Sequence, residues 1–141
     1  MHLIDLDGAR AVHDFLAAHP HLPPVSQIDH VERSGAAGIA SPYFAEHKLL
    51  LEGHRLADVL AWHDALPTLR IALADHAGQV QVRLLCLLPT DTFVCVTALL
   101  DPADGDLLRL NTGLRAGGHL DDLDGLVLRR LVEAYAAEEV A

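Results

Sequence analysis

Histidine is the residue type in this chain that most invites a chemical function. Ten of the 141 residues are histidines, and a neutral imidazole is the commonest metal ligand in proteins. Five of them have spacings that a metal site could use: His19, His21, His47, His54 and His63. Structural zinc sites combine two close ligands with one or two distant ones, but no HExxH pair is present and Gly53 interrupts any single helix that would align His47 with His54. We therefore predict scattered surface histidines, no metal site and no cofactor.

Aspartates gather in the last third of the chain, where they could bind a cation or a basic partner. The candidates are Asp101, Asp104, Asp106, Asp121, Asp122 and Asp124. The first three surround Gly105, but an EF-hand loop has the spacing D-x-D-x-D-G and a bidentate Glu at its twelfth position, and both are missing. We predict a hairpin turn at 101–106, and all six aspartates are candidates for docking on the basic surface of another protein.

The two cysteines, Cys86 and Cys95, lie in apolar runs and form no CxxC motif, which argues against a zinc ribbon and a secreted disulfide scaffold. If Thr90 and Asp91 form a two-residue hairpin loop, Cys86 pairs with Cys95 across two antiparallel strands, close enough for a disulfide. In a cytoplasmic chain we expect two buried free thiols instead.

Motifs for nucleophilic catalysis and phosphate binding are missing from the sequence. It contains no G-x-S-x-G nucleophile elbow. Gly113, Gly117 and Gly118 precede a helix, but the aspartates that follow would repel a phosphate there. Catalytic activity is not predicted, although a small histidine- or metal-dependent enzyme is the alternative function.

The net charge of −10 argues against direct nucleic-acid binding, because proteins that bind phosphate backbones present a basic face. The N-terminus has no signal-peptide pattern. Apolar runs are far shorter than the roughly 20 residues that cross a bilayer. We therefore expect a cytoplasmic protein that does not bind membranes.

Hydrophobic periodicity in the first half predicts alternating helices and strands. A helix follows Asp7 as its N-cap and ends at His19–Pro20, and a short strand spans 25–31. Residues 33–40 predict a loop, and Ser41–Pro42 could open a helix. A strand at 48–52 and a helix at 55–66 follow. Strict alternation at 69–74 and 79–84 around a 75–78 turn predicts a β-hairpin.

The second half is dominated by two strands that are apolar on both faces, at 84–88 and 93–100. A turn at 101–106, a further strand at 107–111 and a final helix capped by Asp121 or Asp122 complete the chain. We predict one α+β domain over residues 1–141, with an antiparallel sheet of about four to five strands and three helices.

Antiparallel sheets usually keep one face in water, so strands that are apolar on both faces need a second cover. The helices of the same chain could supply it, or a second subunit could. The sequence therefore predicts a non-enzymatic interaction module whose partner is another protein or a second copy in a homodimer.

Two segments carry a resemblance to known proteins: "AVHDFLAAHPHLPPV" at 11–25 and "LADVLAWHDALPTLRIALADHAGQVQVRL" at 56–84. They resemble uncharacterised small α+β proteins of actinobacterial genomes, integrative elements and phages. In those, a FLAxHPxLP helix and stop precede a VxAWxxAL helix and a hairpin. The resemblance implies an accessory or inhibitory role in a mobile element or phage, and it assigns no catalytic residue. This chain departs from that pattern in its apolar 84–100 segment.

Overall fold

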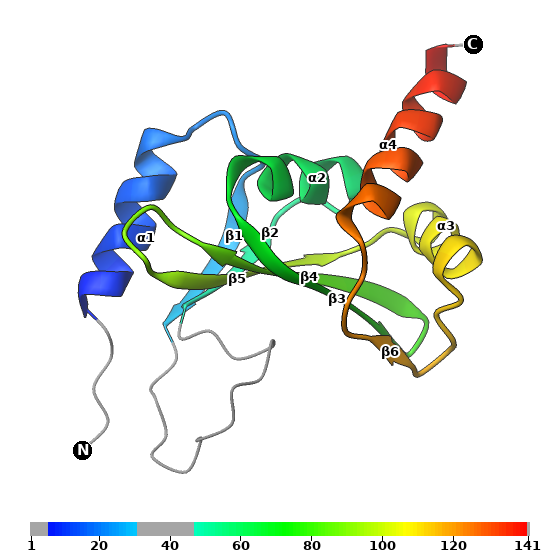
Figure 1. Ribbon diagram of the computed structural model, residues 1–141, viewed down its shortest axis with the longest axis horizontal. Helices are drawn as coiled ribbons and strands as arrows, with labels where there is room; N and C mark the ends of the chain where they lie inside the picture. Colours follow the sequence, from blue (N-terminus) through cyan, green and yellow to red (C-terminus); the bar gives the residue numbers. More distant parts are fainter. Residues whose placement is uncertain (1–5, 31–46, 141) are drawn as a thin grey trace.

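The structure, a computed structural model, describes residues 6–30 and 47–140 of the chain, with side chains as far as Tyr135. Its centre is one six-stranded mixed sheet (Figure 1). The strands are β1 (Val25–His30), β2 (His47–Leu51), β3 (Thr68–His76), β4 (Gln79–Leu87), β5 (Phe93–Leu99) and β6 (His119–Leu120). Their order across the sheet is β1-β2-β5-β4-β3-β6. The predicted α+β class is therefore confirmed.

Four helices accompany the sheet where three were predicted. They are α1 (Leu6–Ala18), α2 (Leu56–Ala65), α3 (Pro102–Thr112) and α4 (Gly125–Val140). Figure 1 shows α1, α2 and α4 above the same face of the sheet. On α3, Gly105 lies against the side chain of Val80, which points to that face as well. All four described helices thus cover one face, here called the helical face.

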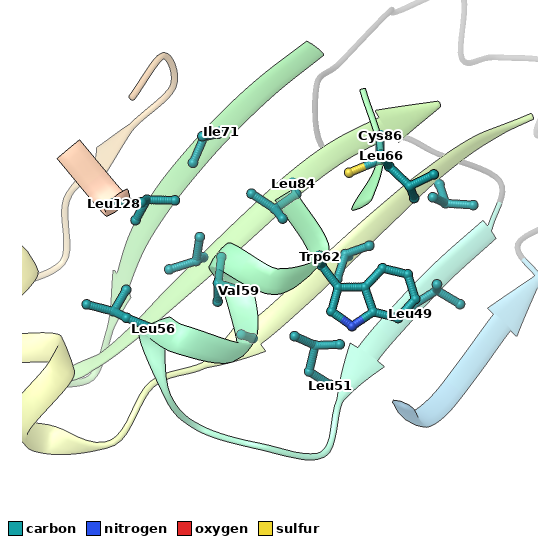
Figure 2. Packing of buried hydrophobic residues seen from close by; sticks show 14 of the residues in the cluster. Leu49, Leu51, Leu56, Val59, Trp62, Leu66, Ile71, Leu84, Cys86 and Leu128 are labelled. Carbon is teal, nitrogen blue, oxygen red and sulfur yellow. The ribbon is translucent and has the colours of Figure 1, made fainter. Parts of the chain in front are cut away.

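The hydrophobic core lies between the helical face and these helices (Figure 2). Trp62 of α2 is fully buried at its centre, and its indole Nε1–H donates a 3.0 Å hydrogen bond to the carbonyl oxygen of Pro23. This bond satisfies the one polar atom of the ring, as a buried tryptophan requires. It also fixes the proline-rich connector between α1 and β1 against α2.

The β3–β4 hairpin confirms the prediction made from strict alternation. Its two-residue loop, Ala77–Gly78, has both residues at positive φ, 51° and 87°. Such turns match the twist of the strands that they connect, and glycine adopts the second position without strain.

The antiparallel sheet predicted from sequence is wrong at one pair, because β2 runs parallel to β5. Parallel neighbours need a long crossover connection, which here consists of α2, β3 and β4. The strand predicted at 48–52 is present as β2. Periodicity within a strand does not reveal a partner so distant in sequence.

The predicted turn at 101–106 and strand at 107–111 are also wrong, because these residues form α3. Asp101 is the N-cap, and its carboxylate accepts a 2.9 Å hydrogen bond from the Asp104 backbone N–H. Pro102 occupies the first turn, and Gly113 ends the helix at φ 74°. Asp, Pro and Gly occur in turns but also start and stop helices, so their positions in this segment are compatible with a turn as well as with a helix.

The helix ends and connecting segments differ in detail from the predictions. The last helix begins at Gly125 and is capped by Asp124, which accepts a 2.9 Å hydrogen bond from Leu126, rather than by Asp121 or Asp122. Asp7 lies in the first turn of α1, which begins one residue earlier. The short strand β6 was not predicted. The loop at 33–40 and the helix at Ser41–Pro42 lie outside the described residues.

Candidate functional site

The face of the sheet opposite the described helices is not explained by the core. The register places four residues of β4 on it and four of β5 directly beside them. They are Gln81, Arg83, Leu85 and Leu87, facing Leu99, Thr97, Cys95 and Phe93 respectively. We call this the second sheet face. Its leucines are half-buried and Phe93 is 50% exposed, so it offers apolar surface to a partner.

Basic side chains also lie on the second sheet face. Lys48 of β2 lies beside Cys95, and Arg83 of β4 lies beside Thr97. Asp29 of β1 lies opposite Lys48, and Arg83 donates a 3.2 Å hydrogen bond to the side chain of Gln81. This face therefore combines apolar side chains with polar and charged ones.

The predicted pairing of Cys86 with Cys95 is wrong by one residue. Cys86 pairs with Val94 and Leu85 with Cys95, because Asp91 adopts a positive φ of 62° and adds a residue to the predicted two-residue loop. A one-residue shift sends side chains to opposite faces. Both cysteines are free and buried, Cys86 towards the helices and Cys95 on the second sheet face.

The two thiols are poor nucleophiles. Burial raises the pKa of Cys86 to about 11, although a hydrogen bond with Thr68 lowers it in part. Burial also raises the pKa of Cys95. Since the thiolate is the reactive form of cysteine, neither residue is suited to nucleophilic catalysis.

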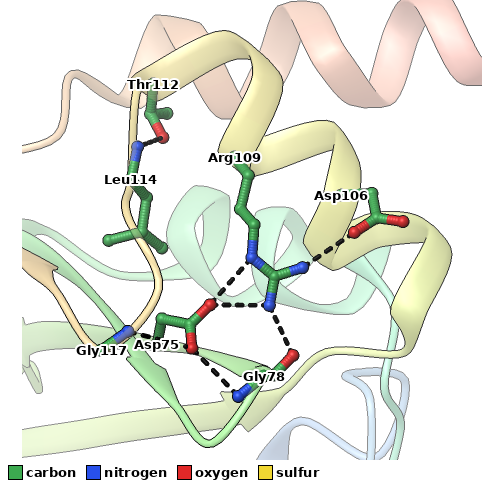
Figure 3. A network of polar contacts seen from close by, with 7 residues as sticks. All are labelled: Asp75, Gly78, Asp106, Arg109, Thr112, Leu114 and Gly117. Carbon is green, nitrogen blue, oxygen red and sulfur yellow. Dashed lines mark hydrogen bonds and ion pairs between the residues drawn. The ribbon is translucent and has the colours of Figure 1, made fainter.

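Asp75 is the centre of a buried polar network that sequence reasoning missed (Figure 3). Its carboxylate accepts hydrogen bonds from the backbone N–H groups of Gly78 (3.1 Å) and Gly117 (3.4 Å). Arg109 of α3 donates to it through Nε at 2.8 Å and approaches through Nη2 at 2.7 Å. The hydrogen bond from Arg109 is the main cause that lowers the pKa of Asp75. The sequence pattern had placed Asp75 only in a turn.

The first three predicted docking aspartates take part in contacts within the protein. Asp106 forms a 2.8 Å ion pair with Arg109, and Asp101 caps α3. Asp104 is buried and accepts hydrogen bonds from Arg55 Nε (3.1 Å) and the Leu56 backbone N–H (2.8 Å). These contacts join α3 to the start of α2. They also give each carboxylate a structural role.

The other three predicted aspartates lie in the segment that leads into α4. Asp122 forms a 3.2 Å ion pair with Arg70 of β3, and Asp124 caps α4. Asp121 is exposed. Whether any of the six aspartates binds a partner stays a prediction.

A hollow between α2, α3 and α4 is a candidate for binding a small molecule. Leucine and valine side chains line it together with Arg55, Asp104 and Tyr135. The guanidinium of Arg55 lies 5.3 Å from the centre of the Tyr135 ring. The charge at the rim is already balanced by Asp104, 3.1 Å away, so nothing at this hollow specifies a ligand.

The histidines whose spacing suggested a metal site do not gather at one point in the structure. His54 contacts the carbonyl oxygen of Leu99 at 2.8 Å, and His63 contacts the hydroxyl of Thr68 at 2.8 Å. The rings of His19 and His21 are neighbours, 5.8 Å apart. Among the side chains that the structure describes, residues 6–30 and 47–135, no three of His, Cys, Asp or Glu converge as a metal site would require.

A different set of histidines does come together, and spacing along the sequence could not have found it. His47 of β2 lies beside His30 of β1, with their Nδ1 atoms 2.8 Å apart. The other ring nitrogen of His30 lies 3.4 Å from Nε2 of His13 on α1. His13, His30 and His47 thus form a chain of three imidazoles across three elements.

Comparisons with protein-family models, with curated proteins and with solved structures find no match. Within the described residues, no helix is both long and apolar enough to cross a membrane.

Proposed function

We propose that this protein is a non-catalytic interaction module that docks a protein on its second sheet face, and that the partner is a second copy of the chain. The observation that carries the proposal is the placement of all four described helices on the opposite face. The central strands are apolar on both faces, so a cover for the second one is expected.

Symmetry supports a second copy as the partner. Two chains of net charge −10 repel each other over most of their surface. Burial of Leu85, Leu87 and Phe93 of the second sheet face against the same residues of a second copy can offset this repulsion. Two-fold dimers that use the same surface on both subunits are the commonest protein oligomers.

The chemistry of the described residues supports a binding role over an enzymatic one. Both thiols have raised pKa values, and most of the predicted docking carboxylates already have a partner within the protein. No observation favours the alternative of a histidine- or metal-dependent enzyme. The accessory role in a mobile element or phage stays a prediction from the resemblance alone.

Light scattering over a range of protein concentrations tests the proposal. We expect a mass that rises to twice that of the chain and does not respond to a chelator. Phe93→Lys should shift the protein to a monomer, because it places a charge within a packed apolar contact. A monomer at every concentration would contradict the proposal.

Leu110→Lys is the matched control, because Leu110 is an exposed leucine of α3 outside the sheet. This variant should dimerise as the original protein does. If Leu110→Lys were a monomer and Phe93→Lys were still a dimer, the interface would lie elsewhere. Circular dichroism of each variant confirms that the fold is retained.

A further inference from the structure

The imidazole chain His13–His30–His47 lies where α1 packs on the edge of the sheet formed by β1 and β2. Burial increases along it: His13 is exposed, His30 is half-buried and His47 is buried. The rings of His30 and His47 meet edge to face with centres 5.0 Å apart, and those of His13 and His30 are 5.5 Å apart. The chain therefore links the surface of a helix to a buried strand position.

The hydrogen bonds between these three imidazoles depend on how many protons the rings carry. A neutral imidazole has one N–H donor and one acceptor nitrogen, so a neutral His30 can donate to one neighbour and accept from the other. A single added proton is tolerated, because His30 would then donate on both sides. If a second proton binds to the three rings, two N–H donors face each other, and at least one hydrogen bond is lost.

Several influences oppose the protonation of His30. Burial is the largest cause that lowers its pKa, followed by the charges of His47 on β2 and His13 on α1, while Asp29 of β1 acts in the opposite direction. Since the pKa of His30 is lower in the folded protein than in the unfolded chain, the unfolded chain binds more protons between the two values. The contribution of His30 to stability is therefore present above about pH 6.5 and is lost as the pH falls.

The geometry of His30 distinguishes these three histidines from a metal site. His30 uses different ring nitrogens towards its two neighbours, so the three residues cannot all ligate one ion through the nitrogens that face one another. We propose instead that His13, His30 and His47 form an acid-sensitive latch. It holds α1 on the sheet edge and releases this helix when the imidazoles become protonated.

Trp62 reports directly on this release. It is the single tryptophan of the protein, it is fully buried, and its ring lies 6.0 Å from Phe15 of α1. When α1 leaves, Phe15 leaves with it and water reaches the indole. The emission maximum should move to longer wavelength, and quenching by acrylamide should increase.

The experiment follows Trp62 fluorescence and far-UV circular dichroism from about pH 7.5 to about pH 5, where histidine titrates. In the original protein we expect the emission to shift while most of the sheet signal persists. In His13→Gln and His30→Gln we expect the shift to lose its dependence on pH in this range. His13 is exposed, so its variant keeps the test valid even if His30→Gln fails to fold.

His19→Gln is the matched control. His19 is also on α1, and its ring stacks on Phe15 at 4.1 Å, so a change at this ring could reach the same reporter. We expect this variant to respond to pH as the original protein does. The latch is ruled out if Trp62 emission is constant across the range, or if His19→Gln removes the response while His13→Gln retains it.

Discussion

At the residue scale, contacts between residues far apart in the sequence decide what each polar side chain does. Asp104 is buried and accepts a hydrogen bond from Arg55, 49 positions away. His13, His30 and His47 meet because β1 pairs with β2 and α1 packs beside them. Spacing along the chain reveals neither arrangement, so the sequence predicts the buried cysteines but not these two clusters.

Asp75 gives the clearest prediction at this scale. Asp75→Asn should lower the midpoint of chemical denaturation, because Arg109 would lose its buried ionic partner. The pKa of Asp75 is held below its ordinary value, so its contribution is present above about pH 4 and is lost as the pH falls further. The substitution should therefore also flatten the dependence of stability on pH in acid.

Asp106→Asn is the control for that measurement, because Asp106 pairs with the same arginine but is exposed to solvent. Urea denaturation at several pH values should show a small effect for this variant. Equal effects of the two substitutions would mean that the buried position of Asp75 adds nothing.

The cysteines give a second prediction at the residue scale. Both thiols are buried and their pKa values are raised, so iodoacetamide at pH 8 should modify neither in the native protein and both in urea. Mass spectrometry after timed labelling measures this directly. Rapid labelling of Cys95 alone would show that the second sheet face opens to solvent.

At the element scale, predictions from periodicity succeeded where the pattern was strong. The helix at 55–66 and the hairpin at 69–84 are present as α2 and the β3–β4 pair. The errors fall at 101–111, where Asp101 and Pro102 suited a turn and a helix start equally, and in the order of strands. Order is decided by contacts such as β2 with β5, which no local pattern records.

The docking of α4 can be tested with two leucines of the same helix. Leu128 is fully buried, whereas Leu126 is 55% exposed. Leu128→Ala should lower the free energy of unfolding by about 2–5 kcal/mol, the usual cost of removing a buried leucine side chain. Leu126→Ala should change it by about 0.5 kcal/mol or less, and urea denaturation compares the two. Similar losses would indicate that α4 is held differently.

At the scale of the whole molecule, net charge opposes dimerisation, whereas the apolar side chains of the second sheet face favour it. Association through apolar side chains must overcome repulsion between two chains of net charge −10. Salt screens this repulsion, since the Debye length falls from about 30 Å at 0.01 M to about 10 Å at 0.1 M. The strength of dimerisation should therefore increase with ionic strength.

Sedimentation equilibrium at low and high sodium chloride measures the dimer dissociation constant, which we expect to fall as salt is added. The aspartates at 101–124 suggest the opposite dependence, because docking of these carboxylates on a basic surface of a second copy would weaken with salt. The sign of the salt effect thus separates the two surfaces. Phe93→Lys adds a second criterion, since it should abolish association through the second sheet face at every salt concentration and leave association through the aspartates intact.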